Sequence, residues 1–466
     1  MYAKYIENAL NLHIVQSLPM TSWHPLLQGD DAERTWAVIG EIAEALRPEV
    51  EKIGPESDPC FAGGTSGLAT FYAYLGAETG SEEWIDLANR LIEHSINALS
   101  ERPLRPDLYA GFTGIAWSLN HLQGILFDDD EEDDDDPIGE ALVRVLDREE
   151  PYGIGQFDLI GGLAGYGIYA FHALSRPAAR RSLELLVRRL IEIGQPVGGE
   201  GFSWYSPPEE LPDWQLRDAP NGKFNLGVSH GVAGVLSVLG MSAGAGVMNG
   251  EQRAILDRAV DWFLAQKQDA PTWRFSNSVI EGLTPKRDRM AWCYGDPGIA
   301  GALFTAARHT GNLRWEAEAL DVARATASRP VKDAFIVDAG LCHGSAGLAH
   351  MFNRYYQASG DPLLADAART WFRYTLELRK PGTGPAGYLF WWDPNWVPTP
   401  GWLMGLSGVG LALLGAVSSR EAAWDQILGV SVPLERLPEP DATSSGDAAD
   451  RREPARAHAH PSGSAG

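Results

Sequence analysis

The chain has 466 residues, of which 44% are hydrophobic and 21% are charged, and its formal net charge is -24 at pH 7. This length allows a large buried core, while the negative charge argues against a general nucleic-acid binder, because contacts with phosphate need a basic surface. Three cysteines do not make a disulfide framework, which leaves metal binding or nucleophilic chemistry as the informative possibilities.

The N-terminus reads MYAKYIENALNLHIVQ, which lacks the apolar core and the small-residue cleavage site of a signal peptide. No run of 18 or more apolar residues occurs along the chain, so the sequence predicts neither a transmembrane helix nor stable insertion into a membrane. We therefore expect a cytoplasmic protein.

A Gly-x-x-Gly step that opens an apolar stretch recurs seven times. One such step is weak evidence, because 51 glycines produce several by chance, but seven in the same context indicate a repeat architecture. The stretches that follow are apolar nearly all round, which predicts buried helices. The leading glycines are Gly64, Gly111, Gly162, Gly231, Gly295, Gly344 and Gly405.

Amphipathic segments lie between the glycine steps. Their apolar residues recur at spacings of three and four, which predicts helices with one face in water. Six segments show this pattern, namely residues 33–53, 82–100, 178–194, 251–268, 313–328 and 362–380.

Each repeat is therefore expected to hold an outer amphipathic helix, a loop, a glycine step and an inner buried helix. An open solenoid needs a terminal unit with a polar outer face. The last inner segment, residues 408–417, is as apolar as the others and needs cover on both flanks. Closing the ring provides that cover, so we predict an all-α fold over residues 1–433. It is an α/α toroid of seven helical hairpins, with an inner ring of seven helices and an outer ring of seven.

Two segments fall outside this pattern. Nine acidic residues run from Asp128 to Asp136, and we expect a solvated loop there, with a docking surface for a basic peptide as the alternative. Residues 434–466 are poor in large apolar side chains and rich in Pro, Ser, Gly and charge. This composition predicts a disordered polar tail.

Reactive side chains stand directly before the glycine step in three adjacent repeats. They are His230 in the fourth repeat, Cys293 and Tyr294 in the fifth, and Cys342 and His343 in the sixth. The same positions in the other four repeats are mostly inert. Because equivalent positions of a closed ring lie at one end of the barrel, we expect these side chains to gather at one rim.

Two cysteines and one histidine, Cys293, Cys342 and His343, have the composition of a zinc site. The alternative is a pair of inert buried cysteines with a hydrogen-bonded histidine. A fourth protein ligand would make the site structural, and the candidates for it are His230 and Cys60. Neither stands at the same position before its glycine step as the two cysteines do. We therefore expect three protein ligands and an open catalytic position. Two thiolates already neutralise the ion, so a substrate thiolate would stay nucleophilic, and the ligand set favours thiol chemistry over hydrolysis.

Addition of a thiolate to an electron-poor alkene gives an enolate, which must then be protonated at carbon. His230 could act as the acid, or as the base that takes the thiol proton, and Asp158 could orient His230 or carry a proton. Arg289 and Tyr294 could stabilise the negative oxygen. A structural role is the alternative for each of these residues.

The sequence resembles the lanthionine synthetase C-like family over about residues 30–420. This resemblance implies the seven-hairpin toroid and a zinc ion bound by Cys293, Cys342 and His343. It also implies active-site roles for His230 and Asp158, with Arg289 and Tyr294 at further functional positions. Besides the repeats, it rests on DLIGGLAG at 158–165, NLGVSHGVAG at 225–234, WCYG at 292–295 and CHGSAG at 342–347.

Bacterial members of this family add cysteine thiols of a precursor peptide to dehydroalanine or dehydrobutyrine and form the thioether rings of lantibiotics. The resemblance thus implies a stand-alone, zinc-dependent lanthionine synthetase that acts on a dehydrated precursor peptide and needs a separate dehydratase. One alternative is a family member that binds thiols or glutathione, or adds glutathione, without cyclising peptides. Another is a structural metal in a protein-interaction solenoid. A glycosidase-type toroid would need paired carboxylates, and none occupies the rim register.

Overall fold

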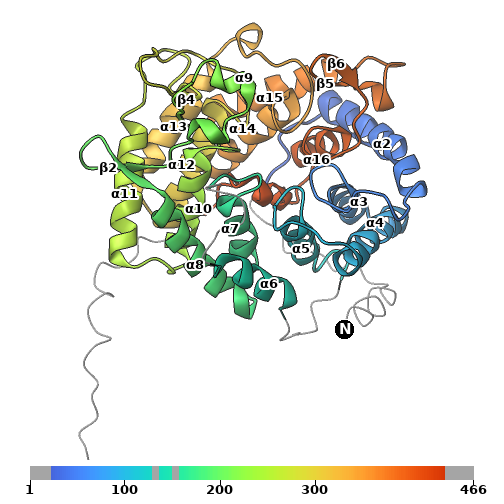
Figure 1. Cartoon of the computed structure of the whole chain (residues 1–466). Coiled ribbons are helices and arrows are strands. Elements are labelled where there is room, and N and C mark those ends of the chain that lie inside the picture. The colour runs from blue at the N-terminus through green and yellow to red at the C-terminus, as the bar shows by residue number, and fades with distance from the viewer. Residues whose placement is uncertain (1–22, 128–135, 149–156, 436–466) are drawn as a thin grey trace, which may run out of the picture.

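The computed structural model describes residues 23–127, 136–148 and 157–435. Within them, helices form two concentric rings (Figure 1). The inner ring consists of α3 (Thr65–Thr79), α5 (Phe112–His121), α7 (Leu163–His172), α10 (Val232–Gly244), α12 (Asp296–Thr310), α14 (Ser345–Ser359) and α16 (Leu406–Val417). The outer ring consists of α2 (Asp30–Glu51), α4 (Glu82–Glu101), α6 (Pro137–Leu146), α8 (Pro177–Ile193), α11 (Gly250–Leu264), α13 (Leu313–Ala327) and α15 (Pro362–Glu377).

The two rings are closed. Each inner helix contacts the next one along the chain, and α16 completes the circle against α3 and α2, while α15 also reaches α2. The predicted toroid of seven hairpins is confirmed. Within the described residues, no helix combines the length and the apolar character that crossing a bilayer would take.

The repeated glycines have a packing reason. Every inner helix begins directly after the leading glycine of its step, which is the residue that caps it. The second glycine lies against the loop that enters the helix: a Cβ on Gly298 would collide with the carbonyl oxygen of Trp292, and one on Gly347 with that of Leu341. Only glycine allows this close approach of backbone to backbone.

Helix α6 is the one outer helix of the described chain whose residues were not located from the sequence, since the six amphipathic segments do not include it. It follows the acidic run directly, and Asp136 caps it by accepting a hydrogen bond from the Gly139 amide at 2.9 Å, with Pro137 in the first turn. The helix buries Leu142 and Leu146. Asp136, the last residue of the predicted loop, is therefore structured. Residues 1–22 and 128–135, and all but the first two residues of the tail predicted at 434–466, lie outside the described residues.

Short elements decorate the toroid. Three antiparallel strand pairs are formed by β1 (Gln195–Val197) with β2 (Gly201–Ser203), β3 (Phe224–Asn225) with β4 (Ser278–Val279), and β5 (Phe390–Trp392) with β6 (Asn395–Val397). The short helical turns are η1 (Pro208–Glu210), α9 (Asp213–Leu216), η2 (Val331–Asp333), η3 (Pro385–Gly387) and η4 (Ala423–Leu428). Most of these precede an inner helix and therefore lie at the end of the barrel where the inner helices begin.

The turn η4 and the residues after it fill the middle of the inner ring. The carbonyl oxygen of Ile427 accepts a hydrogen bond from the Tyr109 hydroxyl at 2.8 Å, and that of Leu428 accepts one from the Trp292 indole at 3.0 Å. Trp424 and Ile427 are buried. The barrel thus has a packed core, and any cavity must lie at its ends.

Candidate metal centre

The loops that precede the inner helices are hydrogen-bonded to one another. The carbonyl oxygen of Cys342 accepts hydrogen bonds from the amides of Trp292 and Cys293 at 3.2 and 3.3 Å. The amide of Cys342 donates to Leu403 at 2.9 Å, and the carbonyl of Cys293 accepts from Val228 at 3.0 Å. The two cysteines therefore occupy the same position in neighbouring, paired loops, which is the physical basis of their shared register.

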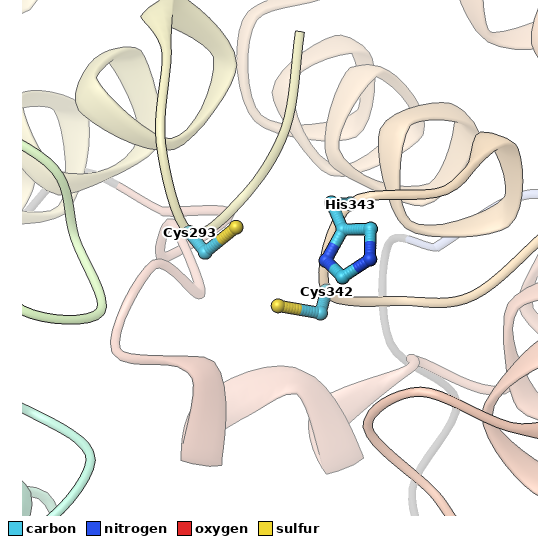
Figure 2. Close-up of side chains that lie close together, drawn as sticks. All are labelled: Cys293, Cys342 and His343. Atoms are coloured by element: carbon cyan, nitrogen blue, oxygen red, sulfur yellow. The ribbon is translucent and has the colours of Figure 1, made fainter. Parts of the chain in front are cut away.

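Cys293, Cys342 and His343 come together at this rim. One ligand atom from each lies within 4.8 Å of the other two, and Figure 2 shows both sulfur atoms and the imidazole facing a shared space. Tetrahedral zinc, with bonds of about 2.3 Å to sulfur and 2.0 Å to nitrogen, places its ligand atoms roughly 3.4–3.8 Å apart. A small contraction of the cluster would meet that geometry.

The local backbone makes this grouping possible. Adjacent residues on a helix do not face each other, but Cys342 and His343 stand in the turn before α14, which begins at Ser345. Behind Cys293 the chain turns sharply at Gly295, whose φ of 114° is in a region that side chains rarely adopt. Both ligand segments are thus irregular backbone supported by helix starts.

The pKa shifts of the two thiols are also compatible with a bound cation. The hydrogen bond from Cys342 holds the pKa of Cys293 well below its usual range, with further help from His343. The resulting thiolate, together with burial, raises the pKa of Cys342 well above its usual range. Ionising both of two neighbouring buried thiols is unfavourable without a counter-charge, and a divalent cation would stabilise the second thiolate. The donor set and its electrostatics fit zinc.

A fourth protein ligand does not join this group among the residues that the structure describes. Cys60 is buried elsewhere, where burial and the nearby carboxylate of Asp58 raise its pKa to about 12. His230 is instead paired with Asp158. Three side chains would leave one coordination position for a substrate, as in catalytic rather than structural sites.

His230 and Asp158 form a pair beside the cluster. His230 Nδ1 donates to Asp158 Oδ2 at 2.6 Å, and the other carboxylate oxygen accepts a hydrogen bond from the Gly161 amide at 2.9 Å. The imidazole is 45% exposed, while Asp158 is largely covered. A histidine oriented in this way can exchange protons through its other ring nitrogen.

Tyr294 and Arg289 border the same space. The Tyr294 hydroxyl accepts a hydrogen bond from the Asn225 side chain at 3.2 Å, and its ring centroid lies 6.4 Å from that of His230. Burial raises the pKa of Tyr294, so the phenol stays protonated at neutral pH and can donate a hydrogen bond. The positive charge of Arg289 contributes to the low pKa of Cys293.

A cavity of about 880 Å³ connects these groups. Among the residues that line it are Cys293, Cys342, His343, His230, Tyr294 and Arg289. Its outer wall, formed by parts of residues 214–229 and 266–288, was missed by sequence reasoning. The repeat spacing indicated that residues are inserted here. Gly162, Gly231 and Gly295 are separated by 69 and 64 residues, whereas Gly64 and Gly111 are separated by 47.

Comparison with known proteins agrees with this architecture. The sequence model of the lanthionine synthetase C-like proteins matches residues 58–429. The nisin biosynthesis protein NisC of Lactococcus lactis subsp. lactis is 24% identical over 306 residues, which are 61% of this chain and 71% of NisC. A structure of nisin cyclase superposes with a TM-score of 0.66 at 20% identity, over 85% of this chain and 97% of that one, and supports the toroid fold.

Proposed function

Because this chain belongs to the lanthionine synthetase C-like family, we propose that it is a zinc-dependent peptide cyclase. It adds cysteine thiols of a dehydrated precursor peptide to dehydroalanine or dehydrobutyrine and forms lanthionine or methyllanthionine rings. The observation that carries this proposal is the three-residue cluster of Cys293, Cys342 and His343 on the wall of a large cavity. The similarity to NisC, a nisin biosynthesis protein, supports the same reaction class.

The cluster would hold zinc through two thiolates and one imidazole. When bound there, zinc would supply the acidity that turns the substrate cysteine into a thiolate at neutral pH. The thiol proton leaves, a bond forms between sulfur and the alkene β-carbon, and the electron pair moves onto the adjacent carbonyl as an enolate. Protonation at the α-carbon completes the addition, so no oxidant or leaving group is needed.

The remaining side chains serve the two proton movements and the enolate. Asp158 keeps the proton of His230 on Nδ1, which leaves Nε2 to take the thiol proton or to protonate the α-carbon. The protonated Tyr294 and the guanidinium of Arg289 are donors that could stabilise the enolate oxygen. All three side chains, His230, Tyr294 and Arg289, line the cavity.

Substitution of Asp158 tests this pairing. In Asp158→Asn the single amide oxygen must serve either His230 or the Gly161 amide, since the native carboxylate uses one oxygen for each. We expect the rate of ring formation to fall on the order of 10²-fold, with zinc content unchanged, as measured by mass spectrometry and elemental analysis. A native rate in the Asp158→Asn variant would contradict the assigned role.

The rim around the cavity supports a peptide ligand over a small thiol such as glutathione. Two large apolar side chains on the cavity wall, Trp214 and Leu283, are 64% and 56% exposed. Exposed apolar surface concentrated in one region is typical of a binding face.

A direct assay decides between cyclase and thiol-binding protein. A dehydrated peptide that carries free cysteine is incubated with the zinc-loaded protein, treated with a thiol-alkylating reagent and weighed by mass spectrometry. We expect the cysteines to resist alkylation after incubation, because their sulfur atoms are in thioethers. Full alkylation would contradict the cyclase, and a glutathione adduct formed in the presence of glutathione would support the alternative.

The proposed reaction requires another enzyme to act on the peptide first. The dehydrated residues must exist before thiol addition, so a separate dehydratase has to act on the peptide first. Both steps would take place in the cytoplasm, which is the location expected from the sequence.

A further inference from the structure

We propose that Lys223 binds a carboxylate of the peptide substrate, either an Asp or Glu side chain or the C-terminus, inside the cavity beside the cysteine cluster. This inference rests on the proposed function in one respect, namely that the cavity receives a peptide. It adds a specificity-determining residue and a preferred class of substrate, peptides with an acidic group close to the ring-forming residues.

The backbone fixes Lys223 next to the candidate active site. Its amide donates to Ser206 at 3.0 Å and its carbonyl accepts from the Ser206 amide at 2.8 Å, directly before strand β3. Side chains two residues apart on extended chain point to the same side, roughly 7 Å from each other. Asn225 is that neighbour, and it contacts the Tyr294 hydroxyl at 3.2 Å.

Lys223 is only 8% exposed and is among the residues that line the cavity. Among the residues that the structure describes, its ammonium group has neither a hydrogen bond nor an ion pair. Burial lowers the pKa of Lys223, and the charge of Asp218 opposes this shift only in part. Buried charges in proteins are normally paired, so the ammonium group of Lys223 is a candidate binding site for an anion.

The other charged groups on the cavity wall differ from Lys223 in exposure. Lys286, Arg289 and Asp218 are exposed, and Asp288 is half-buried. Exposed charges keep their water when a ligand enters and contribute little to binding. Lys223 is buried and, within the described part of the chain, has no ion-pair partner of opposite charge, so a ligand that supplies a negative oxygen should gain more from Lys223 than from any of these.

A carboxylate is the anionic group that a peptide can bring to this position. The distance of about 7 Å from the Tyr294 partner corresponds to two residues of extended peptide. If the reacting carbonyl lies at Tyr294, the group at Lys223 belongs to a residue near the ring. Charge-assisted hydrogen bonds are stronger than neutral ones, so an acidic peptide should be preferred to its amide counterpart.

The test compares synthetic peptides that hold one dehydroalanine, one cysteine and, between them, either Glu or Gln, each with a free or an amidated C-terminus. We expect the wild-type protein to show a KM for the preferred acidic peptide about 10-fold to 100-fold below that of its neutral counterpart. Lys223→Met should remove that preference with little change in kcat. Lys223→Arg should retain part of it, and Lys286→Met, the matched exposed lysine on the same wall, should leave it intact.

Two results would overturn the assignment: equal KM values of the wild type for acidic and neutral peptides, or a loss of kcat in Lys223→Met without loss of preference. Fluorescence anisotropy with labelled peptides that carry Ser in place of dehydroalanine gives a readout without ring formation. An acidic preference in that binding assay, combined with no cyclisation, would defeat the proposed function and leave the Lys223 site standing. Circular dichroism confirms that each variant is folded.

Discussion

The variant Cys342→Ala should lose its zinc and its cyclase activity while keeping its fold. Two protein ligands would remain, and the loss of affinity should exceed the roughly 10-fold to 100-fold caused by removing a hydrogen-bond partner of a ligand. The loop itself should persist, because the hydrogen bonds of residue 342 to Trp292, Cys293 and Leu403 come from its backbone. Elemental analysis, thermal unfolding and the alkylation assay measure the three properties.

Cys60→Ala is the matched control for this experiment. Cys60 is also a free, buried cysteine, but it lies outside the cluster, so zinc content and activity should stay close to those of the wild type. A Cys342→Ala variant that unfolds would indicate a structural metal in an interaction solenoid, and one that retains full zinc would contradict the ligand assignment.

The fold was predictable because its main signal is local. Glycines such as Gly298 and Gly347 are required by a carbonyl oxygen only six residues earlier, so each repeat carries its own signature. Helix α6 carries a weaker signal, since its ten residues follow an acidic run and give a short amphipathic pattern. The turn η4 has no local sequence signal, because its contacts, such as the hydrogen bond from Trp292 to Leu428, join residues 136 positions apart.

The same contrast holds for the candidate site. Cys293, Cys342 and His343 could be grouped from the sequence, since a shared register in a closed ring places them on paired loops. The wall of the cavity could not be grouped in this way. Lys223 belongs to an insertion outside the repeat, and its position depends on a pairing with Ser206 that no periodicity predicts.

A buried ionic network holds the segment that fills the barrel. Arg354 on α14 donates to both oxygens of Asp425 on η4, at 2.8 and 3.0 Å, and to Glu421 at 2.5 Å. His350 Nε2 lies 2.7 Å from the same carboxylate. The side chains of Arg354 and Asp425 are 1% and 3% exposed. Removing one partner of such a buried pair leaves the other charge uncompensated in the interior.

Asp425→Ala should therefore lower the free energy of unfolding by about 3–5 kcal/mol, because it leaves the Arg354 guanidinium buried without its main partner. Urea denaturation followed by circular dichroism measures this loss. The matched control is Asp261→Ala: Asp261 contacts Arg314 at 2.6 Å, but both side chains are 58% exposed, so its loss should cost less than about 1 kcal/mol. Equal effects in the two variants would contradict the importance of burial.

The pH dependence of stability gives an independent check on the same carboxylate. Burial alone would raise the pKa of Asp425, but Arg354 and His350 outweigh it and hold the pKa at about 2, below the ordinary value of 3.8. A lowered pKa in the folded state means that the stabilisation is present above pH 3.8 and is lost as the pH falls toward 2. The stability difference between wild type and Asp425→Ala should therefore be constant near neutral pH and shrink over that interval. A difference that stays unchanged down to about pH 2 would show that the ionised carboxylate is not what anchors η4 in the barrel.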